Sequence, residues 1–441
     1  MQRAGLAVAQ FAMAVAPHAR TIWIACGPGN NGGDGYEAAK HLKSWGKTPI
    51  VTCTGATNNL PVDAAIARQT AVEVGVLFSD AIPPQYDLCI DALFGIGRIR
   101  PWDDRTAGWI ERMNAELVPV VSIDLPSGLN ADTGATHGLH VKAKYTLSLL
   151  TLKPGLFTAD GRAACGDIWF NDLGIVGPEN PTASLNTAPI IRARAHNTHK
   201  GNYGDVCIIG GNSGMTGAAL LAGRAALHGG AGRVFVGLLD PVAARLDTYQ
   251  PELMFRGLSD IAYANMTVVA GCGGSDTIAL HLPRVLTESA RLVIDADALN
   301  AIAKDPTLQR LLVARQPHTT VMTPHPLEAA RLLAISTPDV QADRLGVAQT
   351  LAERFACSVV LKGSGTVIAA PGIVPRINTS GNARLATAGT GDVLAGLIGA
   401  RLSASGDAFE CACEAVFRHG QVADDWSSKA TLTAQALALA L

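Results

Sequence analysis

The sequence predicts an α/β protein of two domains, each with a parallel sheet between two layers of helices. Short β-branched runs alternate with Ala- and Leu-rich helical segments along the 441 residues, and near-continuous apolar strands are typical of parallel sheets buried on both faces. At roughly 150 residues per domain, this length predicts two to three domains. Pro, Asn, Ser and Thr interrupt the alternation over residues 176–188. We therefore expect a linker there, between domains spanning residues 1–180 and 188–441.

Strands are expected wherever a short apolar run is bounded by turn-forming residues. In the first domain we expect strands at residues 21–26, 49–53, 86–93 and 118–124, and helices at 5–16, 34–45 and 62–74. In the second domain we expect strands at residues 205–210, 233–238, 267–271, 291–295, 319–323 and 358–362, and helices that include 217–228 and 392–403. Both domains alternate strand and helix, which favours parallel sheets covered on both faces.

Composition and charge exclude several classes of function. Apolar residues make up 48% of the chain, and 35 Lys and Arg nearly balance 37 Asp and Glu. A net charge of -2 provides no field for nucleic acid or an anionic membrane surface, and no apolar stretch reaches the roughly 18–20 residues that span a bilayer. The nine cysteines are scattered without a CxxC pair, which is typical of free thiols in a reducing compartment. We expect a cytoplasmic protein.

A glycine-rich segment follows the first expected strand. Residues 27–35, GPGNNGGDG, contain the pattern GxGxxG ahead of an expected helix, where a phosphate can approach the helix N-terminus. The dinucleotide fingerprint also needs an acidic residue at the end of the next strand, and residues 51–55, VTCTG, contain none. An ordinary dehydrogenase is therefore disfavoured. A tight turn remains the alternative to a ligand site, although Asn30, Asn31 and Asp34 are too polar for a turn alone.

Two more strands of the first domain end in carboxylates. Asp91 precedes the sequence ALFGIG, and Asp124 opens the sequence DLPSGL. Ligands of open α/β sheets lie at the carboxyl ends of the strands, so both side chains should face the crevice beside residues 27–35. A strand-end aspartate can instead cap the next helix. The side-chain oxygens of Asn31, Asp91 and Ser127 would suit a hard cation.

The second domain has a glycine loop of another kind and no Walker motif. Gly389-Thr390-Gly391-Asp392 precedes an expected helix, so its backbone amides, reinforced by the helix dipole, can form an anion hole. Asp392 would then take a proton from a hydroxyl while the loop holds a transferring phosphate. The alternative is that Asp392 only caps the helix.

Three further segments are expected around the same crevice. Residues 362–366, KGSGT, supply a cation and a glycine turn after one strand, and His325 follows another. Residues 210–219, GGNSGMTGAA, have small side chains that allow either a flat ligand or a neighbouring strand to approach. Asp295 and Asp297 follow a further strand, and the sequence assigns them no role.

Residues 30–35 (NNGGDG), 91–95 (DALFG) and 124–129 (DLPSGL) resemble the NAD(P)H-hydrate epimerase family, and the resemblance covers residues 1–175. It implies a Rossmann-like α/β/α domain and a catalytic Asp124 beside the nicotinamide. It implies contacts to the hydrated nucleotide from Asn30, Asn31, Gly32, Gly33, Asp34, Gly95, Ile96, Gly97, Arg98, Ile99, Arg100, Pro101 and Asp124. It implies potassium ligands at Asn31, Asp91 and Ser127. Family members usually have a helix ahead of the segment that resembles residues 1–5, and we expect its absence to weaken the fold edge, a dimer contact or the activity.

Residues 199–205 (HKGNYGD), 210–219, 323–326 (TPHP), 362–366 and 389–392 resemble the ADP-dependent NAD(P)H-hydrate dehydratase family. The resemblance implies a ribokinase-like α/β/α fold with Asp392 as the catalytic base. It implies nucleotide contacts from Lys362, Gly363, Ser364, Gly365, Thr366 and Gly391. It implies contacts to the hydrated substrate from Ala218, Gly273, His325 and Asp392. Leu327 stands where the family usually has Gly, and residues 271–274, GCGG, replace a GPGLG pattern.

Together the two resemblances imply a bifunctional NAD(P)H-hydrate repair enzyme. The first domain would interconvert the R and S hydrates. The second would use ADP, with Mg²⁺ on the nucleotide, to return the S hydrate to NAD(P)H with release of AMP and phosphate. The implied partners are small molecules, namely ADP and the hydrates of NADH and NADPH (NADHX and NADPHX), together with K⁺, and a homo-oligomer is expected. The alternative is a ribokinase-type vitamin or sugar kinase with a non-catalytic, ligand-binding first domain.

Overall fold

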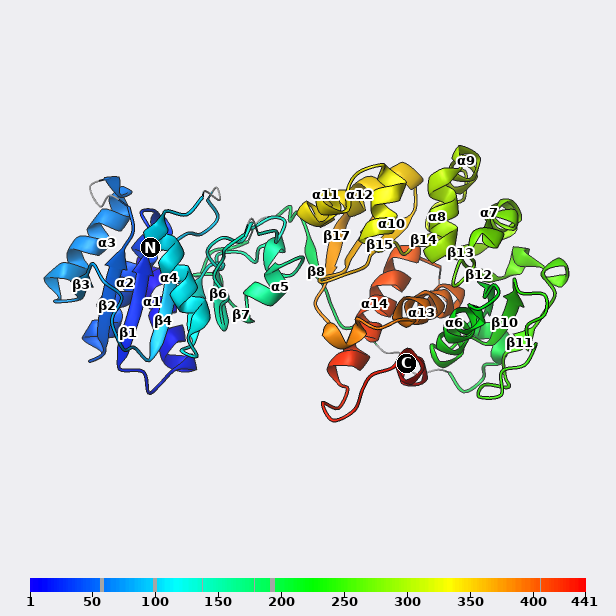
Figure 1. The fold of residues 1–441 in the computed structure, drawn as a ribbon, viewed down its shortest axis with the longest axis horizontal. Helices are drawn as coiled ribbons and strands as arrows, with labels where there is room; N and C mark the ends of the chain where they lie inside the picture. Colours follow the sequence, from blue (N-terminus) through cyan, green and yellow to red (C-terminus); the bar gives the residue numbers. More distant parts are fainter. Residues whose placement is uncertain (56–58, 98–100, 137, 178, 191–194, 405) are drawn as a thin grey trace. The chain divides into compact units, whose positions relative to one another are not determined.

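The computed structural model describes residues 1–55, 59–97, 101–136, 138–177, 179–190, 195–404 and 406–441. These residues divide into two compact units, Met1–Asn180 and Pro181–Leu441. Each unit has its own sheet and its own hydrophobic core (Figure 1). Within the described part of the chain, no helix combines the length and the apolar character needed to cross a bilayer.

The first unit contains a seven-stranded parallel sheet in the order β3-β2-β1-β4-β5-β6-β7. The chain first builds outward from β1 to β3 and then returns to the other side of β1 with β4, so the strand order reverses between β1 and β4. Open α/β sheets bind ligands beside such a reversal. The strands are β1 Thr21–Cys26, β2 Thr48–Cys53, β3 Leu77–Ser79, β4 Leu88–Ala92, β5 Val120–Ile123, β6 Tyr145–Leu149 and β7 Asp167–Asn171.

Helices cover both faces of this sheet because both faces of its central strands are apolar. Ile22 and Ile24 of β1 lie in one buried cluster with residues of α1, α2 and α3, whereas Trp23 and Ala25 lie in another with residues of α4. Successive residues of a strand point to opposite faces, so one apolar run serves two helical layers. The expected α/β/α arrangement is confirmed. The long helices are α1 Gln2–Val15, α2 Asn30–Ser44, α3 Val62–Glu73 and α4 Asp104–Ala115, and the short α5 is Gly161–Ala164.

The second unit contains a ten-stranded sheet in the order β11-β10-β9-β12-β13-β14-β15-β16-β17-β8. Neighbouring strands are parallel except where β16 pairs with β15 and β17, which is antiparallel. The strands are β8 Ser184–Asn186, β9 Asp205–Gly210, β10 Arg233–Leu238, β11 Met254–Phe255, β12 Thr267–Ala270, β13 Arg291–Ile294, β14 Thr320–Met322, β15 Ser358–Leu361, β16 Val367–Ala370 and β17 Ile373–Asn378.

This sheet is also covered on both faces (Figure 1). Val206 and Ile208 of β9 share a buried cluster with α6, α13 and α14, and Cys207 and Ile209 share the opposite cluster with α7, α8, α10 and α12. Because strands β9 to β15 of this sheet are parallel to one another, their carboxyl ends lie at the same edge of the sheet. The helices are α6 Thr216–His228, α7 Leu282–Glu288, α8 Ala296–Lys304, α9 Pro306–Val313, α10 Pro326–Leu333, α11 Thr337–Ala342, α12 Arg344–Phe355, α13 Thr390–Ala404, α14 Ala408–Asp424 and α15 Ala434–Leu439.

The predicted elements agree with the structure where a strand is a continuous apolar run. β1, β9 and β10 have the predicted bounds, because each is buried along nearly its whole length. α2 begins at Asn30, four residues before the predicted start, so the polar glycine segment forms its first turn. β3, β6, β7, β11 and the hairpin of β16 and β17 were not predicted. β7 has no fully buried residue, and such a strand lacks the apolar pattern that reveals one.

β8 lies inside the segment predicted to be an irregular linker, and that prediction is wrong for its three residues. Asn186 is buried and donates from Nδ2 to Asn378 Oδ1 (3.0 Å) and to the Cys413 carbonyl (2.9 Å). The first of these partners lies 192 residues away along the chain. The sequence around residue 186 contains no local signal for a pairing over such a separation.

We expect a fragment that starts at Pro181 to be more stable than one that starts at Ala188. The shorter fragment lacks β8, its pairing with β17 and the two hydrogen bonds donated by the Asn186 amide, and each such hydrogen bond contributes about 0.5–1.5 kcal/mol. Thermal unfolding of the two fragments measures the difference. Asn186→Ala in the longer fragment should reproduce part of it, and equal midpoints for the two fragments would contradict this boundary.

Two candidate active sites

The first candidate site lies at the carboxyl ends of β1, β4 and β5, beside the reversal of strand order. β1 and β4 are hydrogen-bonded neighbours, and the Gly27 amide after β1 donates to the Ala92 carbonyl at the end of β4 (2.9 Å). α2 starts at Asn30, and Ser127 follows β5. Residues predicted from three separate motifs therefore meet at one edge of the sheet.

The glycines in residues 27–35 allow the chain to pack closely against itself. A Cβ on Gly32 would overlap the carbonyl oxygen of Gly27, and a Cβ on Gly27 would overlap the carbonyl oxygen of Leu93. A Cβ on Gly35 would lie 2.6 Å from the Ala92 Cβ, far inside van der Waals contact. The first turn of α2 can therefore begin directly against β1 and β4. Tight packing accounts for these glycines, and the polar residues of the segment remain for a ligand.

Asp91, at the end of β4, is the centre of a buried hydrogen-bonded cluster. Its carboxylate accepts from Ser122 Oγ (2.8 Å), from the Ser127 amide (2.9 Å) and from Ser127 Oγ (2.6 Å). The Ser127 hydroxyl also accepts from the Phe94 amide (2.9 Å). Burial raises the pKa of Asp91, while the donors from Ser127 and Ser122 act in the opposite direction. The cluster ties the loop after β4 to the loop after β5.

Asn31 lies against the same loops and has a polar atom without a partner. A Cβ on Gly95 would be 3.5 Å from Asn31 Oδ1, and Asn31 Nδ2 is buried with no hydrogen-bond partner among the described residues. A carboxamide turned by 180° exchanges its oxygen and nitrogen, which would place Oδ1 in the buried position. Side-chain oxygen atoms such as those of Asn31, Asp91 and Ser127 are of the type that hard cations prefer.

Asp124 follows β5 in a backbone conformation that is unusual for its residue type. Its φ is 71°, and a non-glycine residue in the left-handed region costs of order 1–3 kcal/mol. Its Oδ1 accepts from the Leu149 amide (3.1 Å) and from the ammonium of Lys153. Lys153 also donates to the Leu149 carbonyl (2.6 Å). The Asp124 carboxylate is therefore fixed by an ion pair and a backbone amide.

Asp34, in α2, lies within the electrostatic influence of Asp124. Burial raises the pKa of Asp34 to about 7; the N-terminal ammonium of Met1 opposes this shift, and the charge of Asp124 adds to it. The first site thus contains one carboxyl group that is partly protonated near neutral pH and one carboxylate held by a lysine. Carboxyl groups in such different environments are suited to act as an acid and a base.

The predicted substrate loop of the first unit is described only in part. Gly95, Ile96, Gly97 and Pro101 are described, and Arg98, Ile99 and Arg100 lie outside the described residues. Trp102, beside the loop, donates from Nε1 to the Leu139 carbonyl (2.6 Å). Its ring centroid lies 5.3 Å from that of Phe94. Residues on both sides of the loop are therefore fixed by contacts with neighbouring segments.

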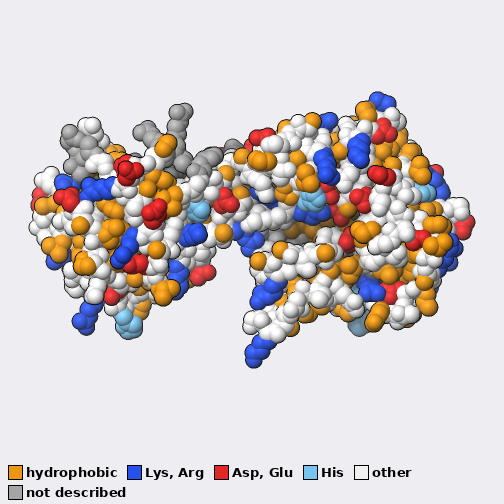
Figure 2. Space-filling view, viewed as in Figure 1, with side chains coloured by type: hydrophobic (Ala, Val, Ile, Leu, Met, Phe, Trp, Pro, Cys, Tyr) orange, Lys and Arg blue, Asp and Glu red, His pale blue; other side chains and the backbone are white. Residues whose placement is uncertain are grey.

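The second candidate site lies at the carboxyl edge of the ten-stranded sheet. Cys272 follows β12, Asp295 follows β13 and Lys362 follows β15, while Asp392 is in the first turn of α13. One side-chain ligand atom from each of Cys272, Asp295 and Asp392 lies within 4.8 Å of the other two. In the face of this unit shown in Figure 2, acidic and basic side chains lie together beside a hollow. The structure therefore brings the predicted motifs of the second domain together.

Asp392 is the third residue of α13. Among the described residues, its carboxylate accepts no hydrogen bond from a helix amide, so the alternative of a helix cap receives no support. Burial raises the pKa of Asp392 to about 6; the neighbouring Asp295 adds to the shift, and Cys272 and Lys362 oppose it. A general base works best when its pKa lies near the working pH.

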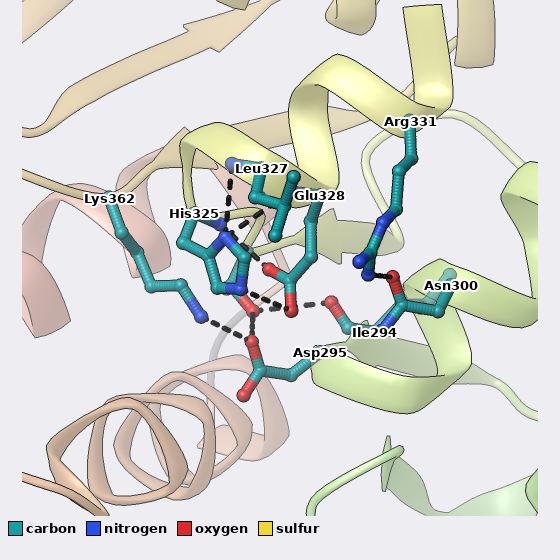
Figure 3. A network of polar contacts seen from close by, with 9 residues as sticks. Ile294, Asp295, Asn300, His325, Leu327, Glu328, Arg331 and Lys362 are labelled. Carbon is teal, nitrogen blue, oxygen red and sulfur yellow. Dashed lines mark hydrogen bonds and ion pairs between the residues drawn. The ribbon is translucent and has the colours of Figure 1, made fainter. Parts of the chain in front are cut away.

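The ammonium of Lys362 lies between a buried carboxylate and the glycine loop of α13. Its Nζ is 2.6 Å from Asp295 Oδ1 (Figure 3), and that oxygen also accepts from Thr323 Oγ1 (2.7 Å). A Cβ on Gly391 would lie 3.5 Å from Nζ. Burial alone would lower the pKa of Lys362, but the carboxylates of Asp295 and Glu328 raise it, and the net shift is upward. A cation is therefore held beside the amides expected to bind phosphate.

His325 caps α10 through its ring (Figure 3). Nδ1 accepts from the amides of Leu327 (3.1 Å) and Glu328 (3.2 Å), and Nε2 lies 3.2 Å from Glu328 Oε1. Burial and the charge of Lys362 lower the pKa of His325, which favours the neutral ring. Both ring nitrogens have partners within α10, which leaves the ring face for a substrate.

The small residues of the loop after β9 pack on the loop after β12. Gly273 has a φ of 60°, and a Cβ on it would lie 2.7 Å from the Met215 carbonyl and 3.0 Å from the Ala218 Cβ. The Asn212 amide donates to the Gly273 carbonyl (2.7 Å). Packing is thus the reason for the small side chains here, and it also places Ala218 beside Gly273, as a shared substrate contact requires.

Residues 362–366 form a tight turn that joins β15 to β16. Gly363 and Gly365 have φ values of 134° and 60°, which glycine adopts without steric cost. Arg344 of α12 is 1% exposed and donates to the two carbonyls that precede Gly363 (3.1 Å each). The buried guanidinium of Arg344 therefore stabilises the turn that is expected to bind the nucleotide.

Known proteins match this chain along nearly its whole length. Residues 206–441 match a family described as NAD(P)H-hydrate dehydratase, and residues 1–155 match one described as YjeF-related protein N-terminus. The bifunctional NAD(P)H-hydrate repair enzyme Nnr of Escherichia coli (strain K12) is 36% identical to this chain, over 96% of this chain and 84% of that protein. The chain belongs to the family of bifunctional NAD(P)H-hydrate repair enzymes.

Two further comparisons agree with this assignment to the repair enzymes. The enzyme of the same name from Coxiella burnetii is 33% identical over 96% of this chain and 89% of that protein. A ribokinase-like superfamily protein from Enterococcus faecalis V583 has a TM-score of 0.50 and 28% identity, over 57% of this chain and 89% of that chain. The second unit therefore has the ribokinase-like fold, and the chain is an NAD(P)H-hydrate epimerase and dehydratase rather than a vitamin or sugar kinase.

The acidic side chains of the dehydratase site do not fit a resident Mg²⁺ ion. Asp295 Oδ1 already accepts from Lys362 and Thr323. Cys272 offers a soft thiol, and Mg²⁺ prefers hard oxygen ligands in an octahedral arrangement. We assign none of these side chains to the metal, which would arrive on the phosphates of the nucleotide.

Two residues that support these sites in the repair enzyme were not predicted from the sequence. Lys153 follows β6, a strand that was not itself predicted, so its place at the carboxyl edge was not visible. Arg344 lies in α12, where nothing in the sequence distinguishes it from an exposed arginine. The burial of Arg344 depends on how α12 packs. A lysine shortly after a strand is a signal that could have identified Lys153, whereas no local signal identifies Arg344.

Proposed function

We propose that the first domain interconverts the R and S hydrates with Asp124 as base and Asp34 as acid. The reaction must break and re-form a bond at the hydroxyl-bearing carbon, so one group has to accept a proton while another donates one. Lys153 and the Leu149 amide orient the Asp124 carboxylate, and Asp34, with a pKa of about 7, has a proton to give. The first turn of α2 and residues 95–101 would contact the hydrated nucleotide.

We propose that Asn31, Asp91 and Ser127 hold K⁺ in the first site. The orphaned amide atom of Asn31 supports this, together with the buried oxygen cluster of Asp91 and Ser127. The ion would supply a fixed positive charge beside the phosphates or the hydroxyl of the substrate. The side chains would hold it between the loops after β1, β4 and β5.

K⁺ should raise the melting temperature of the protein, since a ligand that binds only the folded state stabilises it. Na⁺ at the same ionic strength should do so less. Asn31→Ala should remove most of this difference and slow R-to-S interconversion. Thermal unfolding in matched chloride buffers tests the ion without relying on activity, and equal effects of K⁺ and Na⁺ on the native protein would contradict the site.

In the second domain, we propose that Asp392 removes the proton from the hydroxyl of the S hydrate. The hydroxyl oxygen attacks the terminal phosphoryl group of ADP, and AMP leaves. Phosphate then departs with that oxygen while a neighbouring proton is lost, which restores the double bond of NAD(P)H. The Gly389–Gly391 amides and Lys362 would stabilise the transferring group. Residues 362–366 would contact the nucleotide, and Ala218, Gly273 and His325 would contact the hydrate.

The observation that carries this mechanism is the partly buried Asp392 carboxylate beside the Lys362 ammonium and the glycine loop. The test is incubation of the protein with S-NADH hydrate and either ADP or ATP, followed by NADH absorbance and released phosphate. One phosphate per NADH formed supports phosphorylation followed by elimination. A stable phosphorylated product without NADH would contradict it.

We also propose a cytoplasmic location and self-association for this enzyme. All nine cysteines are free thiols, and free thiols persist in reducing compartments. Size-exclusion chromatography with light scattering tests the expected homo-oligomer.

A further inference from the structure

We propose that Asp295 is a positioning residue of the dehydratase, which holds the Lys362 ammonium against the glycine loop where the phosphoryl group is transferred. The proposal rests on the mechanism above and gives a role to a carboxylate that the predicted site does not include. Asp295 follows β13 in the middle of the parallel strands. It is 1% exposed, so it contacts protein groups rather than solvent.

The contacts of Asp295 fix one of its oxygens in a single position. Oδ1 lies 2.6 Å from Lys362 Nζ and accepts from Thr323 Oγ1 at 2.7 Å. The Thr323 hydroxyl also lies 3.2 Å from the Ile294 carbonyl, which anchors it to the end of β13. In Figure 3 the side chains of Lys362 and Asp295 reach toward each other from separate elements. The Asp295 carboxylate is thus fixed in position, and it can hold the ammonium at the end of the flexible Lys362 side chain in one place.

Lys362 would have other partners if Asp295 were absent. A lysine ammonium sits on a flexible four-carbon chain and pairs readily with any nearby carboxylate. Burial raises the pKa values of both Glu328 and Asp392, and the charge of Lys362 is close enough to oppose this rise at each of them. A direct pair with Asp392 would occupy the carboxylate that is proposed to act as the base. Asp295 therefore keeps the cation and the base apart.

The charges around Asp392 show how the proton affinity of the base depends on the same pair. Burial is the main cause of its raised pKa, and among the neighbouring groups Asp295 and Asp297 add to the shift, while Cys272 and Lys362 oppose it. Removal of the Asp295 charge should lower the pKa of Asp392. A Lys362 ammonium released from Asp295 would act in the same direction. The pH profile therefore reports on Asp295, even though Asp295 need not touch the substrate.

The test is Asp295→Asn in the full-length protein, assayed with S-NADH hydrate and ADP from about pH 5 to 9. The amide keeps an acceptor for Thr323 but loses the charge that holds Lys362. Loss of a hydrogen bond between charged groups should lower kcat/KM for ADP by about tenfold or more. The acid limb of the pH profile should move to lower pH. Unchanged kcat/KM and an unchanged profile in a folded variant would overturn the proposal.

A double-mutant cycle separates positioning from a merely structural role. Because Asp295 acts through Lys362, Asp295→Asn combined with Lys362→Met should lose no more activity than Lys362→Met alone, whereas additive losses would overturn the proposal. Asp297→Asn is the matched control, since Asp297 accepts from the Ser275 amide (2.8 Å) rather than from Lys362. It should leave the KM for ADP unchanged and move the acid limb less than Asp295→Asn does, because its charge contributes less to the raised pKa of Asp392.

Two outcomes keep this proposal distinct from the mechanism on which it rests. Full activity of Asp392→Asn would contradict the mechanism itself. An inactive Asp392→Asn with a native-like Asp295→Asn would contradict only the positioning role. If Asp295→Asn fails to fold, Thr323→Val removes the orienting hydroxyl and keeps both charges; it should raise the KM for ADP by a smaller factor, and an unchanged KM would overturn the proposal.

Discussion

The Asp392→Asn variant is expected to keep its fold and to lose about 10²–10⁴-fold in the rate of NADH regeneration, the usual contribution of a general base. Asparagine matches aspartate in shape but accepts no proton. The pKa of Asp392 in the folded protein, about 6, is above the ordinary value of 3.8. The ionised carboxylate therefore destabilises the folded protein relative to the unfolded chain. Above about pH 6, replacing it by the neutral amide should not lower the melting temperature.

The pH dependence of dehydration checks the same residue. The base must be ionised, so the rate for the native enzyme should fall as the pH drops through about 6. Initial rates of NADH formation and a thermal melt of each protein supply the measurement. Near-normal turnover in Asp392→Asn would remove the residue from the mechanism, whereas a lower melting temperature would indicate a structural role.

Loss of the Asp124 carboxylate is expected to abolish R-to-S interconversion while ADP-driven dehydration of the S hydrate continues. Asp124→Asn is the sharper substitution than Asp124→Ala, because Asn tolerates the left-handed backbone at φ 71° and Ala does not. The amide can still accept from Leu149, so the variant loses the charge and the proton acceptor but keeps the fold. We expect a loss of about 10²-fold or more.

The measurement is the ratio of the R and S hydrates over time, resolved by chromatography, beside the dehydration rate of the same sample. Lys153→Met is the companion variant. It removes the partner of the Asp124 carboxylate and should slow interconversion without affecting dehydration. Interconversion at the native rate in Asp124→Asn would show that the assignment is wrong.

Both sites could be predicted from sequence to the extent that they depend on strand ends. Asp91, Asp295 and Lys362 each come at the end of an apolar run, and parallel strands bring their carboxyl ends to one edge. Polar residues at such places are visible in a single sequence. The role of the glycines was less predictable, because the close approach of Gly32 to Gly27 depends on where α2 begins.

The pattern of apolar and polar residues was sufficient for the α/β class, the bounds of β1, β9 and β10 and the motif residues at their ends. A buried strand and the polar residue that ends it can both be recognised from a few neighbouring residues of the sequence. The partners of those motif residues were decided by the tertiary structure. Lys153 pairs with Asp124 across 29 positions and Lys362 with Asp295 across 67. Such pairs depend on which strands become neighbours and in which register, and that is settled by the packing of the whole sheet.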